Sequence, residues 1–212
     1  MNILVLGASK GTGALCVASA LEKGHRVTAF ARTPSKLALD HAHLTKLTGN
    51  FHDEASVRGA VKGHDAVLVT ASVSSLSEFK TTPDYFSRGT RFAIDAMKEF
   101  GVRRLVVLSA FGAGESAVGA GWLLRTLMVN LLLKRPFQDH DVQEAATMSS
   151  GLEWVIARPS RLTDGPAKGR YVRETDPKKG VPSAISRADV ADFMVEASVS
   201  RDYVDHAVSL GG

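Results

Sequence analysis

Cysteine is almost absent from the 212-residue sequence, which contains only Cys16. One cysteine excludes an internal disulfide and is typical of a reducing compartment, so we expect a cytoplasmic protein. Because Cys16 lies in an apolar stretch expected to be helical, a buried structural thiol is favoured over a nucleophile. His41 and His43 flank one alanine, but no cysteine or third histidine nearby completes a metal site. We therefore expect no metal.

The sequence also lacks a hydrophobic run long enough to span a bilayer, which takes about 20 apolar residues. The apolar stretch from Gly119 to Leu133 is too short and is interrupted by Arg125 and Asn130. Two interpretations of it stay open: a wall or lid over a hydrophobic substrate, or a surface packed on the core or on a second subunit. Because the first residues already form an expected buried strand, we predict no signal peptide and no membrane association.

Charge of one sign does not dominate, since 26 Lys and Arg stand against 22 Asp and Glu, for a net charge of +4. The cations are scattered, so we predict no nucleic-acid partner, and a slightly basic surface suits anionic cofactors and substrates. Repeats and low-complexity linkers are absent as well. We expect one α/β domain over residues 1–212, as a monomer or weak homodimer.

The beginning of the chain carries the strongest pattern. An apolar run from Ile3 to Leu6 predicts a buried strand, and a second apolar strand is predicted from Arg26 to Phe30. Between them a helix is preceded by a glycine-rich turn, which contains Gly7, Gly11 and Gly13. Strand, glycine turn, helix and strand in this order are the dinucleotide-binding fingerprint. The glycines let backbone N–H groups approach a pyrophosphate, which the helix N-terminus attracts.

The residues after the second strand indicate which dinucleotide binds. A site for NAD usually has Asp or Glu there, to accept hydrogen bonds from the ribose 2′-hydroxyl. This chain instead has Arg32, Thr33, Ser35 and Lys36 around one proline. Arg32 can fork onto a 2′-phosphate, while Ser35 and Lys36 add a donor and a second cation. We predict NADPH as the cofactor, and a solvated basic turn is the alternative.

Strands and helices alternate along most of the chain, which predicts a doubly wound parallel sheet of the Rossmann type. Further strands are expected over Leu44–Leu47, Ala66–Thr70, Arg104–Leu108 and Trp154–Ala157, and helices over Glu54–Lys62, Asp84–Phe100 and Asp189–Ser198. Ligands of such sheets bind outside the carboxyl ends of the strands. The cofactor residues expected at these ends are Gly7, Ser9, Lys10, Gly11, Thr12, Gly13, Arg32, Thr33, Ser35, Lys36, Asn50, Phe51, Ala71, Ser72, Ser109, Ala110, Pro159 and Leu162.

The glycine spacing G-x-x-x-G-x-G and Ser109 at the end of a strand resemble the short-chain dehydrogenase/reductase superfamily. Most members also have a Tyr-x-x-x-Lys pair, but Tyr85, Tyr171 and Tyr203 have no lysine four residues later. The absence argues against an ordinary alcohol dehydrogenase. Asn50 stands where the superfamily often has an Asp facing adenine, and its amide can still pair with the base.

Several segments resemble the NmrA-like branch, and within it the flavin reductase and biliverdin-IXβ reductase group. They are Ala31–Lys36, Ala96–Phe111, Asp139–Glu144, Gly151–Pro159, Leu162–Gly165 and Ile185–Val190. The resemblance implies an NADPH-dependent reductase that passes hydride to a flat conjugated acceptor such as a flavin, quinone or bilin. It also implies that Ser109 lies beside the nicotinamide and that His140 borders the substrate pocket, with substrate-side elements in 110–150 and 158–185. Arg161 replaces a second pocket histidine.

Ser109, His140 and Arg161 are therefore the candidate catalytic residues. Ser109 can bond a carboxamide or an acceptor oxygen, or it can tie down the glycine loop after it. His140 titrates near neutrality and can protonate or orient an acceptor, although an exposed, solvated histidine is the alternative. We place it at a helix start, because Asp141 and Glu144 have the spacing of a capping box.

Two other functions remain open at this point. One is an NmrA-like regulator that senses NADP(H) without turnover. The other is an enzyme acting on a sugar-linked or isoflavone-like substrate, although the catalytic Lys or Tyr of such relatives cannot be placed here.

Overall fold

A computed structural model of the chain describes residues 1–73, 81–119 and 133–212. Its strands are β1 (Asn2–Leu6), β2 (Arg26–Ala31), β3 (Leu44–Thr48), β4 (Ala66–Val69), β5 (Arg104–Leu108), β6 (Glu153–Pro159), β7 (Arg161–Thr163), β8 (Val172–Glu174), β9 (Ala184–Ser186) and β10 (His206–Gly211). Its helices are α1 (Gly11–Glu22), α2 (Glu54–Val61), α4 (Tyr85–Phe100), α6 (Lys134–Met148) and α7 (Arg187–Val199), with short 3₁₀ turns η1 (Pro34–Lys36) and η2 (Gly114–Ala117). Each predicted strand and helix is present, with ends shifted by a few residues.

The main sheet has the strand order β3-β2-β1-β4-β5-β6-β10-β8. Every neighbouring pair in it is parallel except β10 and β8, and β7 pairs with β9 in a small second sheet. The order reverses direction between β1 and β4, which is the switch point where ligands of open α/β sheets bind. The predicted Rossmann-type sheet is confirmed.

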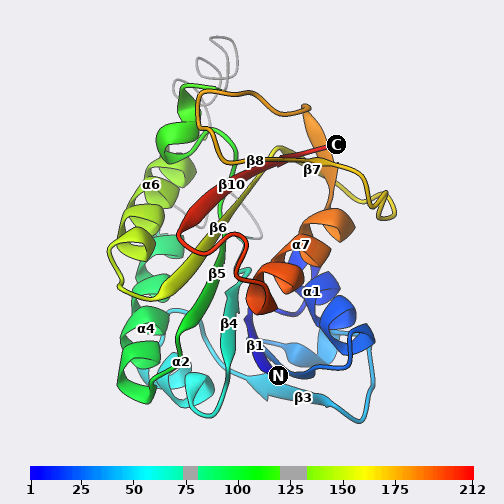
Figure 1. Ribbon diagram of the computed structural model, residues 1–212. Coiled ribbons are helices and arrows are strands. Elements are labelled where there is room, and N and C mark those ends of the chain that lie inside the picture. The colour runs from blue at the N-terminus through cyan, green and yellow to red at the C-terminus, as the bar shows by residue number, and fades with distance from the viewer. Residues whose placement is uncertain (74–80, 120–132) are drawn as a thin grey trace.

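Helices cover both faces of this sheet (Figure 1). α1 and α7 lie together on one face, while α2, α4 and α6 pack against one another on the other. β1 is continuously apolar because both of its faces are buried. Ile3 and Val5 belong to the core beneath α1 and α7, whereas Leu4 and Leu6 belong to the core on the opposite face. A strand buried on both sides has no polar alternation.

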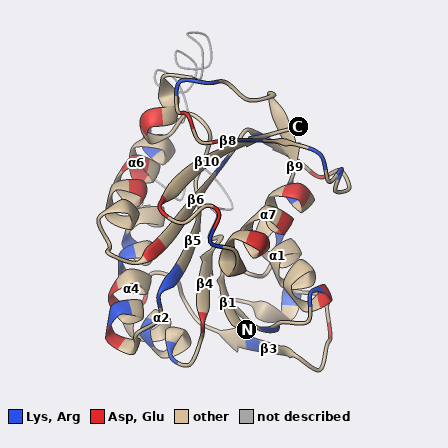
Figure 2. Cartoon of the chain, in the orientation of Figure 1, with Lys and Arg blue, Asp and Glu red and all other residues tan. Residues whose placement is uncertain are grey.

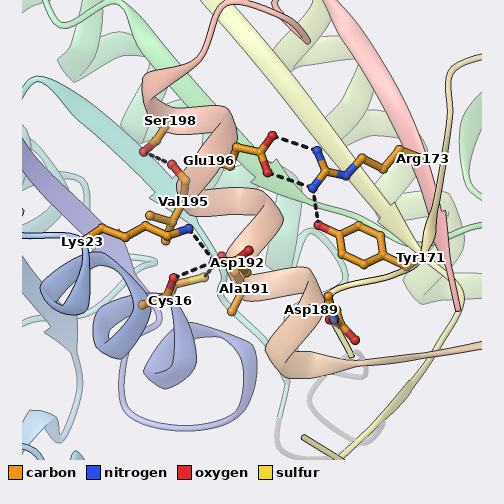
Figure 3. Close-up of polar contacts among 12 residues, drawn as sticks. Cys16, Lys23, Tyr171, Arg173, Asp189, Ala191, Asp192, Val195, Glu196 and Ser198 are labelled. Atoms are coloured by element: carbon orange, nitrogen blue, oxygen red, sulfur yellow. Dashed lines mark hydrogen bonds and ion pairs between the residues drawn. The ribbon is translucent and has the colours of Figure 1, made fainter. Parts of the chain in front are cut away.

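Edge strand β8 is fastened to α7 by Arg173. Its guanidinium forms a two-point ion pair with Glu196 at 2.8 Å and donates to the Tyr171 hydroxyl at 2.9 Å (Figure 3). Burial raises the pKa of Tyr171 to about 12.

Cys16 is fully buried, and its Sγ lies 3.9 Å from the carbonyl oxygen of Ala191 (Figure 3). Burial raises the pKa of this thiol, so the prediction of a structural cysteine is confirmed.

The predicted start of the helix at His140 is wrong. α6 begins at Lys134, with Pro136 in its first turn, where a missing N–H costs nothing. His140 therefore lies within the helix, and Asp141 and Glu144 form no capping box. Asp139 instead caps a different helix, because its carboxylate accepts hydrogen bonds from the backbone N–H groups of Phe86 and Ser87 at 2.5 and 3.2 Å, at the start of α4.

Basic and acidic side chains are interspersed over the helices (Figure 2). In the part of the chain that the structure describes, no helix is long and apolar enough to cross a membrane. The apolar stretch from Gly119 to Leu133 falls almost entirely outside the described residues, as do residues 74–80 of the loop after β4.

Candidate functional site

A cavity of about 340 Å³ opens at the carboxyl ends of β1, β2, β3 and β4. Most of the cofactor residues predicted from the sequence line it, namely Gly7, Ser9, Lys10, Arg32, Thr33, Lys36, Asn50, Phe51, Ala71 and Ser72. Phe30, Ala31, Gly49, His52 and Tyr85 also line it and were not predicted. Phe30 and Ala31 end β2, directly before Arg32, so their place at the carboxyl end of a strand could have identified them. Tyr85 comes from α4, which is distant in the sequence and gives no local signal.

The glycine turn forms one end of the cavity, and its three glycines have different structural reasons. Gly7 has a φ of +96°, and a Cβ there would lie 2.6 Å from the Cα of Ala71. A Cβ on Gly13 would lie 2.3 Å from the carbonyl oxygen of Gly7, so this glycine permits close packing of α1 on β1. Gly11 has a φ of +57°, and its nearest neighbour in that direction is the Arg187 Nε at 3.8 Å. The turn is therefore closely packed against the protein at Gly7 and Gly13 and faces open space at Gly11.

α1 begins without a side-chain cap, and its first turn contains no acidic residue. The N–H groups of a helix's first turn have no partner within the helix and carry partial positive charge. The open space above Gly11 and these N–H groups together suit an anion.

The outer rim of the cavity is basic. Lys10, Arg32 and Lys36 line it, and among the described residues no carboxylate does. Arg32 is exposed directly after β2, and Lys36 is exposed in η1, which the buried Pro34 holds against the domain. Ser35 lies in the same turn but does not line the cavity. An anionic group of the ligand is the complement of this rim.

Aromatic rings form the inner wall. The His52 Nε2 lies 3.0 Å from the carbonyl oxygen of Tyr85, and the Tyr85 hydroxyl donates to the carbonyl oxygen of Ser72 at 3.3 Å. Phe51 is buried against α4 at Gly89, where a Cβ would lie 2.3 Å from the ring. The Asn50 Oδ1 accepts from the backbone N–H of His52 at 3.1 Å, which fixes the orientation of its amide at the cavity.

Ser109 belongs to a buried ionic network that the sequence analysis missed. Its Oγ donates to the Glu144 Oε1 at 2.6 Å, and the same carboxylate receives Arg158 Nε at 3.0 Å and Nη2 at 2.7 Å. Glu144 and Arg158 are each only 2% exposed. Gly114 lies so near that a Cβ there would be 2.3 Å from the Glu144 Oε2. The Ser109 proton is thus directed to Glu144, which leaves the oxygen lone pairs as acceptors.

His140 is buried and lies parallel to the Phe86 ring, with ring centroids 4.1 Å apart. Its Nδ1 is 2.9 Å from the Gln143 Oε1, and the Gln143 amide donates to the Thr90 hydroxyl at 2.9 Å. Burial lowers the pKa of His140, against the opposing effect of Gln143 and of the carboxylates of Glu144, Asp139 and Asp141. The exposed alternative is wrong, because the ring is buried, and this burial moves its pKa below that of a free imidazole, which favours the neutral ring. With Nδ1–H donated to the Gln143 Oε1, a neutral ring leaves Nε2 as an acceptor.

The remaining predicted residues lie at the other strand ends. Arg161 is exposed in β7, Leu162 beside it is partly buried against the core, and Pro159 is the buried end of β6. Gly11, Thr12, Gly13, Ser35, Ser109, Ala110, Pro159 and Leu162 do not line the 340 Å³ cavity. Within the described ranges, no hydrogen bond or ion pair joins Ser109, His140 and Arg161 to one another, and no cluster of His, Cys, Asp or Glu could hold a metal ion.

The switch-point cavity, the glycine turn and the open start of α1 define a dinucleotide-binding protein of the Rossmann class. The family model described as NAD(P)H-binding matches residues 7–200, so the chain belongs to this family. The NAD(P)-binding family expected from the sequence is thereby confirmed.

The chain is similar to curated relatives over only part of their length. Sterol demethylase protein B from Methylococcus capsulatus is 31% identical over 171 residues, which are 76% of this chain and 52% of that protein. The chain spans about a third of a 3-beta-hydroxysteroid dehydrogenase from Mycolicibacterium neoaurum, at 35% identity over 128 residues that are 57% of this chain and 34% of that protein.

Solved structures share the whole fold at low identity. ChuY, an anaerobillin reductase from Escherichia coli O157:H7, has a TM-score of 0.79 at 23% identity and covers 100% of this chain and 97% of its own. A short-chain dehydrogenase/reductase from Veillonella parvula, in complex with NADP, has a TM-score of 0.81 at 19% identity over 100% and 94%.

Proposed function

We propose that the protein is an NADPH-dependent reductase that transfers hydride to a planar conjugated acceptor, such as a flavin, quinone or bilin. The observation that carries the cofactor preference is the rim of Lys10, Arg32 and Lys36 without a carboxylate at the end of β2. An NAD site usually has an acidic residue at this position, where it would repel a 2′-phosphate.

Each part of the cavity has a role in this proposal. Arg32 forks onto the 2′-phosphate, with Lys36 and Lys10 adding positive charge. The Asn50 amide, fixed by its bond to His52, faces the adenine edge. The pyrophosphate lies on the start of α1, over Gly11. When bound, the nicotinamide supplies the hydride, and the protein binds and orients it and excludes water.

Among the residues that the structure describes, the acceptor side has no dedicated acid, which suits a conjugated acceptor because such a molecule delocalises the added charge. Ser109 and His140 both present hydrogen-bond acceptors, since the Ser109 hydroxyl donates to Glu144 and burial disfavours the protonated form of His140. They orient donor groups of the cofactor or substrate. Arg161 is an exposed cation suited to anionic acceptors such as flavin mononucleotide. The likeness to ChuY, named an anaerobillin reductase, is in line with an acceptor of this kind.

A second candidate is an NADP(H)-sensing protein without turnover. One observation favours it: Ser109 and His140, the residues expected to contact the cofactor or the acceptor, both make buried hydrogen bonds within the protein. The two functions share the cofactor site and differ in whether bound NADPH is oxidised.

The cofactor preference is tested by Arg32→Ala, with Arg91→Ala, an exposed arginine of α4, as the matched control. A charge-assisted phosphate contact is worth roughly 1.5–3 kcal/mol, so NADPH affinity should fall about tenfold to a hundredfold in calorimetry. NADH affinity should be nearly unchanged. Equal losses for both cofactors, or none, would show that the basic turn faces solvent.

Turnover is tested by following NADPH oxidation with flavin mononucleotide, a neutral quinone and biliverdin. We expect oxidation with at least one of them, and a lower Michaelis constant for the anionic acceptors than in Arg161→Ala. Tight NADPH binding without oxidation by any acceptor would favour the sensor.

A further inference from the structure

Arg187 reaches the glycine turn from the start of α7. Its Nε lies 3.8 Å from the position of a Cβ on Gly11, the first residue of α1. The two helices run side by side in the same direction, because contacts advance along both: Gly11 faces Arg187, and Cys16 and Lys23 contact Ala191 and Asp192 (Figure 3). Both helices therefore begin at the same edge of the sheet, where the cofactor cavity opens.

The partner of Arg187 in this structure is Asp164, with 2.5 Å between Nη1 and Oδ1. The Asp164 side chain is 89% exposed and that of Arg187 is 29% exposed. An ion pair so open to water is weak, and this one uses a single donor of the five that a guanidinium has. Arg187 can therefore exchange partners at little cost.

The loop that carries Asp164 has a separate anchor. The Asp189 carboxylate accepts hydrogen bonds from the backbone N–H groups of Lys168 at 2.9 Å and Gly169 at 2.9 Å. Burial would raise the pKa of Asp189, but these bonds and that of Ser186 lower it overall. The loop thus stays attached to α7 when the Asp164 contact is released.

A hollow of about 490 Å³ lies between the loop and the glycine turn, bounded by Gly11, Asp164 and Arg187 among others. We propose that Arg187 is a further cofactor-binding residue, which exchanges Asp164 for a phosphate oxygen of the bound NADP(H) pyrophosphate. Asp164 is then a competitor that occupies the guanidinium in the absence of cofactor. The inference rests on the proposed cofactor site. Arginine favours the pyrophosphate over this one exposed carboxylate, because the pyrophosphate carries two negative charges and can accept two parallel bonds, whereas Asp164 accepts one.

The two partners of the ion pair should change affinity in opposite directions. In calorimetry with NADP⁺, Arg187→Gln should weaken binding about tenfold, because one charge-assisted contact is lost. Asp164→Asn should strengthen binding about twofold to fivefold, because the competing carboxylate and its repulsion of the phosphates are removed. A purely structural ion pair would make both variants bind the same or worse.

Two controls separate this effect from others. Adenosine 2′-monophosphate lacks the pyrophosphate, so its affinity should be the same in wild type and Arg187→Gln. Asp192→Asn removes a different exposed ion pair of α7, the one with Lys23 at the end of α1, and should leave NADP⁺ binding unchanged. Arg187→Lys keeps the charge and should lose less affinity than Arg187→Gln, and it serves as the test if the glutamine variant does not fold.

The inference is overturned if both variants shift affinity in the same direction or by less than twofold, or if adenosine 2′-monophosphate is weakened as strongly as NADP⁺. If the wild-type protein binds both adenosine 2′-monophosphate and NADP⁺ in those cases, the proposed cofactor site still holds and only the role of Arg187 is refuted. Wild type that binds neither would refute the cofactor site and this inference together.

Discussion

Glu144→Gln is the substitution from which we expect the largest change in stability. It removes the negative charge but keeps an oxygen that can accept from Ser109, so it isolates the ion pair with Arg158. Both side chains are 2% exposed and are joined at 2.7 and 3.0 Å. The arginine left behind would be a buried charge without a counter-ion.

Removing one partner of a buried ion pair costs about 3–5 kcal/mol. In a protein of this size, each kcal/mol lowers the melting temperature by about 2–4 °C, so the variant should melt roughly 6–20 °C below wild type. Arg158→Met should be similarly costly alone. The double variant should lose clearly less than the sum of the two, because no unpaired charge then remains.

The chain provides a matched control on its surface. Arg58 and Glu99 form an ion pair of the same two-point geometry, with side chains 55% and 44% exposed. Glu99→Gln should change the unfolding free energy far less than Glu144→Gln, because water screens the pair. Urea unfolding of the four variants, monitored by circular dichroism, gives the comparison. If Glu144→Gln costs no more than Glu99→Gln, the carboxylate does not compensate a buried charge and the reasoning fails.

Gly13→Ala should lower the melting temperature more than Gly11→Ala, because its Cβ would lie 2.3 Å from a backbone oxygen while that of Gly11 meets nothing nearer than 3.8 Å. Gly11→Ala should instead weaken NADP⁺ binding in calorimetry, and the reverse pattern would contradict the roles assigned to the two glycines. For His140 the folded pKa is below the unfolded one, so the folded state binds fewer protons and stability falls as pH drops below about 6.5. Between pH 7.5 and 5.5, His140→Phe should therefore lose less unfolding free energy than wild type. The exposed-site control His43→Phe should behave like wild type. If the unfolding free energy of His140→Phe and of wild type falls equally with pH, His140 is protonated as readily in the folded protein as in the unfolded chain.

The cofactor half of the site was predictable because its signals are local. Gly7, Gly13 and Arg32 come after strands that their apolar runs identify. Because the strands are parallel, their carboxyl ends lie at the same edge of the sheet. Even there, the distinct reasons for the glycines depend on contacts with β4 and β1 that no spacing rule contains.

The acceptor half could not be predicted because its signals are ambiguous along the chain. Glu144 fits a capping box with Asp141 in sequence, and only the packing of α6 against β6 shows that it pairs with Arg158. The stacking of His140 on Phe86 brings together residues on α6 and α4, which are far apart in the sequence. Burial and long-range pairing decide protonation, and neither is encoded in spacing.

The cavity has a floor in which backbone meets backbone at Gly7 and Ala71, and a rim of exposed cations. These two parts govern different steps of binding. Charges such as Arg32 and Lys36 act on an approaching anion over about 10 Å in physiological salt, so they set the association rate and its dependence on ionic strength. The close-packed floor acts only after contact and has no room to yield, so it sets how long a ligand of the right shape stays bound.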